Sequence, residues 1–218
     1  MRRTLALAIL LIPSTLLGQR SALREVRRGG AGQGILGIEF TVAEPLGEFR
    51  RTGGHAAGLA LHGVTRGQPL GVRIDAGWMV YDVGDGAYGS RLTSQIGSLM
   101  VGPQVTLGQG PMRVYGFVAG GGSFFWSDAS YSDGCGCSDS DFLDGDVTLS
   151  RSAGAGMLLS LSRKVSIDFG VRETRHDRVS YFPAGGLVDN GDGTYSGQKV
   201  ETSVLQRVWQ IGVSIGLN

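Results

Sequence analysis

Apolar and polar residues alternate with a period of two along most of the chain from residue 35 onward. This is the period of a β-strand whose two faces meet different surroundings. In the clearest run Val72, Ile74 and Ala76 alternate with Arg73 and Asp75. Eight runs of this kind each predict one strand, at residues 35–43, 56–64, 70–81, 95–107, 113–126, 146–161, 165–176 and 203–217.

The connections between the predicted strands alternate between short and long. The short ones are residues 65–69, 108–112 and 162–164; the long ones are 44–55, 82–94, 127–145 and 177–202. Each strand has the nine or more residues that a tilted strand needs to cross a bilayer. Outer-membrane barrels have short periplasmic turns and long external loops. We therefore expect the short turns and both termini in the periplasm and the long loops outside.

The two faces of the predicted strands differ in chemistry. One is apolar, and the other is small and polar and carries six ionisable residues: Glu39, His62, Arg73, Asp75, Asp168 and Arg172. If this polar face lines a narrow lumen, the charges can pair with one another. The apolar face then contacts lipid, and closure of the barrel leaves no unpaired strand edge in the membrane. The six residues then form either a static salt-bridge plug or the lining of an ion path.

The large aromatic side chains are expected on the apolar, outward face. On the fifth strand Tyr115, Phe117 and Ala119 are assigned to it, opposite Gly116, Gly120 and Gly122. Because outer-membrane barrels carry aromatic girdles at both membrane interfaces, we expect girdle residues toward the strand ends. They are Trp78, Tyr115, Phe124, Trp126 and Trp209.

Composition supports this interpretation. Of 218 residues 38 are glycine, more than twice the average share of about 7% in proteins. A tightly curved barrel wall and a crowded lumen favour glycine, which has no side chain. The formal net charge of +1 gives no support for nucleic-acid binding. The sequence has no apolar run long enough for a transmembrane helix.

The first residues have the pattern of a secretory signal peptide. Arg2 and Arg3 precede the apolar stretch Leu5–Ile12, and the small residue Gly18 is followed by Gln19 rather than by a lipidated cysteine. We predict a signal peptide over 1–18, a flexible basic leader over 19–34 and the barrel over 35–218.

The corner Pro45-Leu46-Gly47-Glu48-Phe49 and the glycine-rich alternation resemble the small outer-membrane barrel family of the OmpA transmembrane domain, OmpX and OmpW. The resemblance implies an all-β, transmembrane, antiparallel up-and-down barrel of eight strands in a Gram-negative outer membrane. It further implies insertion by the barrel assembly machinery, contact with outer-membrane lipid and lipopolysaccharide, and a monomer. The chain departs from the family pattern at its end, Gly216-Leu217-Asn218, where an aromatic residue is usual.

Two candidate sites lie in the expected loop 127–145, the first of them extending to Asp146 just beyond it. Asp139, Asp141, Asp144 and Asp146 gather the oxygen ligands that Ca²⁺ prefers, although the spacing is not that of an EF-hand; the alternative is a solvated acidic loop. Cys135 and Cys137 are the only cysteines. In an oxidising compartment they predict a disulfide that staples the loop locally.

No motif for catalysis or for a further cofactor is present. The only histidines are His55, His62 and His176, and none stands in a recognised nucleophile motif. We therefore expect a non-enzymatic structural and surface protein with long external loops. A narrow, OmpW-like passage for small or apolar solutes is the alternative. An outer-rim enzyme that uses His176 and Asp177 is a third possibility.

Overall fold

The computed structural model describes residues 34–65, 69–85, 91–108, 110–132, 138–162, 164–191 and 194–217, all within one compact unit, Gly32–Asn218. The predicted signal peptide, most of the predicted leader, and Cys135 and Cys137 lie outside these residues.

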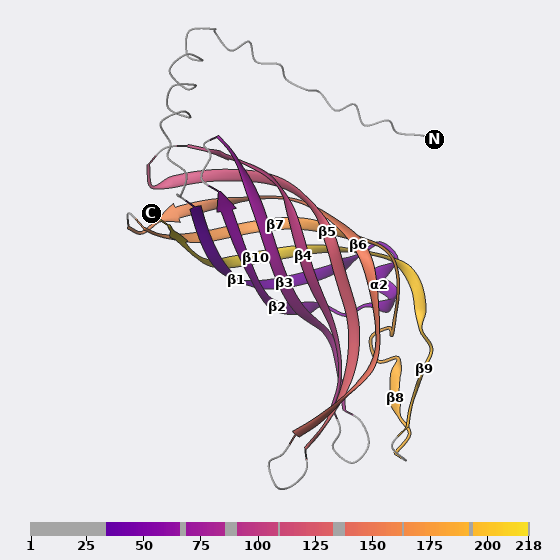
Figure 1. The fold of residues 1–218 in the computed structure, drawn as a ribbon. Helices are drawn as coiled ribbons and strands as arrows, with labels where there is room; N and C mark the ends of the chain where they lie inside the picture. Colours follow the sequence, from indigo (N-terminus) through magenta and orange to yellow (C-terminus); the bar gives the residue numbers. More distant parts are fainter. Residues whose placement is uncertain are drawn as a thin grey trace, which may run out of the picture. The chain divides into compact units, whose positions relative to one another are not determined.

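Eight antiparallel strands close into one barrel in the order β1-β10-β7-β6-β5-β4-β3-β2. Figure 1 shows the curved wall that they form. The strands are β1 (Gly34–Leu46), β2 (Ala56–Thr65), β3 (Leu70–Asp85), β4 (Arg91–Leu107), β5 (Met112–Ser132), β6 (Ser138–Ser160), β7 (Val165–Tyr181) and β10 (Val200–Gly216). Pairing of β1 with β10 closes the ring, so every strand of the barrel has a neighbour on each side. The predicted eight-stranded up-and-down barrel is confirmed.

The strands agree with the predicted ranges within one residue at the short-turn ends and, on all but β2, run farther at the long-loop ends. The largest difference is at residues 127–145, predicted as a loop, where β5 continues to Ser132 and β6 begins at Ser138. Pairing extends along this hairpin as far as Ser132 opposite Ser138. The loop prediction is wrong because backbone hydrogen bonds continue a hairpin even where the side chains no longer alternate between apolar and polar.

The residues between β7 and β10 hold a separate small hairpin, β8 (Leu187–Asp189) paired with β9 (Tyr195–Gly197). The link between β1 and β2 contains the short helix α2 (Phe49–Thr52). No helix among the residues that the structure describes is long and apolar enough to span a membrane.

The face assignment is correct on seven strands and wrong on β5. Tyr115, Phe117 and Ala119 are buried inside the barrel, and the outward positions between them are Gly116 and Val118. Tyr115 is therefore not a girdle residue, whereas Trp78, Phe124 and Trp209 are exposed on the outer wall as expected. The reversal has a steric cause on β6, where Gly156 stands opposite Tyr115 and leaves room for its ring.

The long-loop end of the barrel interior is filled by an apolar layer. Phe49 of α2 is almost completely buried there. Its ring makes edge contacts with Tyr81 and Tyr181, at centroid separations of 6.2 and 5.6 Å. Phe125 packs beside both tyrosines. On the short-turn side of this aromatic layer the interior holds a polar region and a second, smaller apolar cluster around Tyr115, Phe117 and Leu158.

Candidate functional site: the charged interior

Alternate inward positions on β1, β2, β3 and β7 hold the six ionisable residues that the sequence pattern assigned to the lumen. Each is at most 4% exposed: Glu39, His62, Arg73, Asp75, Asp168 and Arg172. The strand register brings them together, with His62 directly opposite Asp75 on the β2–β3 pair. Gly212 on β10 is the register partner of both Glu39 and Asp168, so the position between these two carboxylates carries no side chain.

Arg73 and Asp75 form the closest ion pair of the cluster. Nε of Arg73 donates to both carboxylate oxygens of Asp75 at 2.8 and 2.9 Å, and an Nη atom lies 2.7 Å from Oδ1. Arg172 approaches the same oxygen at 3.6 Å. The remaining face of Arg73 stacks over Phe117, whose ring centroid lies 4.5 Å from the guanidinium carbon. This geometry holds a guanidinium in place inside the barrel by hydrogen bonds and by a cation–π contact.

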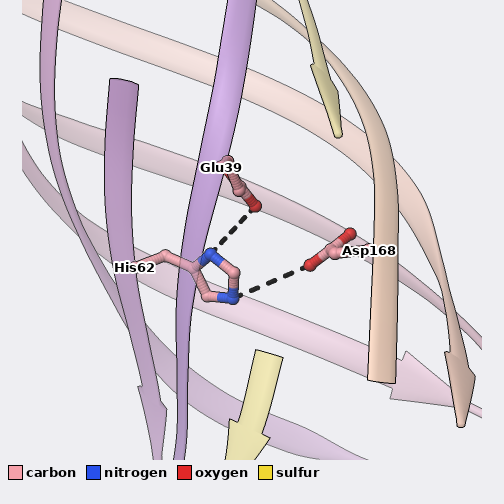
Figure 2. Close-up of side chains that lie close together, drawn as sticks. All are labelled: Glu39, His62 and Asp168. Carbon is pink, nitrogen blue, oxygen red and sulfur yellow. Dashed lines mark ion pairs between the residues drawn. The ribbon is translucent and has the colours of Figure 1, made fainter. Parts of the chain in front are cut away.

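The imidazole of His62 lies between the other two carboxylates, as Figure 2 shows. Its Nδ1 is 2.9 Å from Oε1 of Glu39, and its Nε2 is 3.7 Å from Oδ2 of Asp168. The ring needs the space beside Gly37, because a Cβ there would come within 2.2 Å of its Cε1 atom. The sequence therefore supplies both the ring and the gap that admits it.

Tyr115 joins the two halves of the cluster, a role that strand patterning did not reveal. Its hydroxyl donates to Oδ1 of Asp168 at 2.7 Å, and the amide of Gln210 donates to Glu39 at 3.0 Å and to Tyr115 at 3.3 Å. A Cβ at Gly156 would stand 2.4 Å from the end of the tyrosine ring. The inward glycine on β6 thus admits the ring, which is why β5 turns this face inward.

Glu39, His62 and Asp168 have the ligand types of a metal site, with one atom of each within 4.8 Å of the others. The surrounding contacts favour ion pairing instead. Nδ1 of His62 is already at hydrogen-bond distance from Glu39, and the guanidinium of Arg73 lies 3.6 Å from the same carboxylate oxygen. A second cation placed there would be repelled by Arg73. The arrangement therefore serves best as an ion-paired filling of the barrel.

A second polar group, centred on His176, lies closer to the aromatic layer. Nδ1 of His176 is 2.7 Å from Oγ of Ser150, and its Nε2 is 2.9 Å from the amide of Gln206. His176 is only 1% exposed, whereas Asp177 is exposed on the outer wall and pairs with Arg151 at 3.7 Å. The two residues considered for an outer-rim enzyme therefore lie on opposite sides of the barrel wall.

The acidic residues considered for Ca²⁺ do not form a cluster in the part that the structure describes. All four lie on β6 rather than in a loop, and the side chain of Asp139 is outside the described part. Asp144 pairs with Lys199 at 2.6 Å, and Asp146 accepts the backbone N–H groups of Val147 and Ser180. An extended strand advances about 3.3 Å per residue, so the backbone spaces these carboxylates along β6, and Asp144 and Asp146 each already have partners of their own.

No protein-family model and no curated protein matches this sequence. Among solved structures the chain is similar to Neisserial surface protein A (12% identity, TM-score 0.46, 85% of this chain and 97% of that one). It is also similar to Ail of Yersinia pestis, solved with a heparin analogue (14%, 0.47, 85% and 98%), and to a major outer membrane protein of Thermus thermophilus (16%, 0.46, 86% and 100%). At these identities the likeness concerns the fold alone.

Proposed function

We propose that the protein is an integral outer-membrane barrel that acts as a closed, non-enzymatic structural and surface element. The observation that carries the proposal is the inverted distribution of polarity across the wall. Phe40, Leu61, Ile74, Val101 and Ile211 on the outside keep 49–53% of their surface exposed. In the same structure Arg73 is 1% exposed.

A water-soluble barrel would have the opposite arrangement, with its apolar face inside. A contiguous apolar surface of this size is stable when lipid covers it, and a closed ring leaves no backbone group unpaired in the hydrocarbon. With the short turns in the periplasm, the long loops and the β5–β6 hairpin would face outward and contact lipopolysaccharide or other cells. The assembly machinery would insert the chain as a monomer.

The experiment is cell fractionation followed by electrophoresis in SDS with and without boiling. We expect the protein in the outer-membrane fraction, with an unboiled band that migrates differently and resists protease. Recovery from the soluble periplasm without detergent, and without a heat shift, would refute the proposal.

A pair of substitutions tests the lipid-facing surface directly. Ile74→Arg, in the middle of the outer wall, should destabilise a membrane barrel by about 2–4 kcal/mol. Val83→Arg, at an equally exposed site near the loop end of β3, should cost at most about 1 kcal/mol. In a soluble barrel the two changes would have similar, small effects.

The filled interior supports a closed barrel over the alternative of a passage for small or apolar solutes. An eight-stranded interior is just wide enough for side chains to fill, and here the aromatic layer and the ion-paired cluster occupy it. We expect no discrete conductance in planar bilayers. Steady openings that disappear on neutralising Asp75 or Asp168 would instead favour the channel. Hydrolysis of lipid A or peptides that is abolished by His176→Ala would favour an enzyme.

A further inference from the structure

A shallow groove of about 680 Å³ runs over the outer wall where β1, β10, β7 and β6 lie side by side. Its lining is apolar and includes three aromatic rings, those of Phe40, Phe169 and Trp209. Val171 and Met157 complete the wall between them. The groove has the volume and chemistry to hold an acyl chain against the barrel.

The groove ends at a row of charged residues toward the loop end of the barrel. The next outward position after Trp209 on β10 is Arg207, and the next after Val171 on β7 is Glu173; these two form an ion pair at 2.7 Å. By contrast, the outward positions of β5 carry apolar residues or glycine as far as Trp126. The apolar belt is therefore shorter on the groove side, and charged groups lie within reach of it.

Two arginines stand opposite each other one outward position farther toward the loop end. Arg151 on β6 and Arg175 on β7 are direct cross-strand partners, an arrangement in which like charges destabilise a sheet. Asp177 approaches Arg151 only at 3.7 Å, with both side chains more than half exposed. Among the described residues, no carboxylate lies within ion-pair distance of Arg175. The pair thus presents two guanidinium groups to an anion from outside the chain.

We infer that this wall binds one phosphorylated, acylated lipid of the surrounding leaflet. The lipid phosphate is held by Arg151 and Arg175, and one acyl chain lies in the groove along Trp209 and Phe169. Paired guanidinium groups match phosphate oxygens through bidentate hydrogen bonds. The inference rests on the proposed function, since it requires the barrel to sit in a membrane with its loop end at the phosphate layer.

The occupant is a lipid rather than a second copy of the chain. A twofold contact centred on this face would bring the Arg151–Arg175 pair of one copy toward the same pair of the other, and like charges across an interface oppose association. A phosphorylated lipid supplies both features that the wall lacks: an anion at the arginines and hydrocarbon in the groove.

The test is native mass spectrometry of the full chain released from detergent and titrated with bisphosphorylated lipid A. We expect one tightly bound lipid per barrel. The variant Arg151→Gln/Arg175→Gln should weaken this binding at least tenfold, and Ala155→Trp, which fills the groove, should weaken it as well. The matched control Arg50→Gln/Arg91→Gln removes two exposed arginines away from the groove and should bind as the wild type does.

Two further probes separate the sources of affinity. Dephosphorylated lipid A, with the same acyl chains, and inorganic pyrophosphate, with no chain, should each bind at least tenfold more weakly than the intact lipid. Equal binding by the Arg151→Gln/Arg175→Gln variant, or by dephosphorylated lipid A, would overturn the inference. So would a lipid-free dimer that Ala155→Trp dissociates. Every variant is first checked for the heat-dependent band shift of a folded barrel. If the wild type lacks this shift, the proposed function itself fails. If the variants are folded and bind lipid as the wild type does, only the proposed lipid site is refuted.

Discussion

Replacing Asp75 by asparagine tests whether the charged cluster is a desolvated part of the barrel. The carboxylate is 3% exposed and takes three contacts of 2.7–2.9 Å from Arg73, with Arg172 at 3.6 Å. The substitution leaves both guanidinium groups buried without their shared counter-ion. Breaking a buried pair in this way costs about 3–5 kcal/mol. Two unit charges about 4 Å apart at an effective dielectric constant near 20 give a similar value, about 4 kcal/mol.

The assay is urea-induced unfolding of the barrel in lipid vesicles, with the folded fraction measured by the unboiled band in SDS. A loss of about 4 kcal/mol lowers the folding equilibrium constant roughly a thousandfold. The control is Asp144→Asn, which removes a partly exposed partner of Lys199 and should change stability by about 0–1 kcal/mol. Replacing the whole pair, Arg73→Met/Asp75→Leu, should destabilise less than Asp75→Asn alone. Equal effects of Asp75→Asn and Asp144→Asn would refute the reasoning and indicate a hydrated lumen.

The same unfolding assay tests three other packing features. Gly156→Ala should destabilise the barrel clearly, because the added Cβ would stand 2.4 Å from the ring of Tyr115. The control Gly120→Ala should be nearly neutral, because its Cβ would meet only a backbone oxygen at 3.9 Å. The opposite ranking of the two variants would contradict the inward position of the Tyr115 ring. Tyr115→Phe should cost about 1.5–3 kcal/mol, because it removes a buried hydrogen bond to the Asp168 carboxylate, and an unchanged midpoint would exclude that bond. Phe49→Ala should cost about 3–5 kcal/mol, since the ring is 1% exposed; a loss below about 1 kcal/mol would mean that α2 does not fill the barrel end.

The period of two was sufficient to predict the eight strands and the six ionisable residues of the interior. Residues such as Arg73 and Asp75 alternate with outward valine and isoleucine residues. Only one orientation of the strand therefore places the apolar side chains in lipid and the charged side chains in the interior. Their pairing also followed, since a narrow interior leaves buried charges few other partners. Which atoms pair could not be predicted, because register between strands sets those distances: His62 meets Asp75 across one strand pair but contacts Glu39 and Asp168 through its ring.

The sequence by itself determined the barrel, its strand order and the polarity of seven of its eight strand faces, because local alternation between apolar and polar side chains encodes them. Only the tertiary structure decided the face of β5, where rings alternate with glycines and no charged residue stands between Arg113 and Asp128. Pairing of β5 with β6 places Gly156 opposite Tyr115 and leaves space for its ring. The tertiary structure likewise decided that Phe49 is buried in the loop end of the barrel and how far the β5–β6 hairpin extends. These features depend on contacts between residues far apart in the chain, which no local pattern contains.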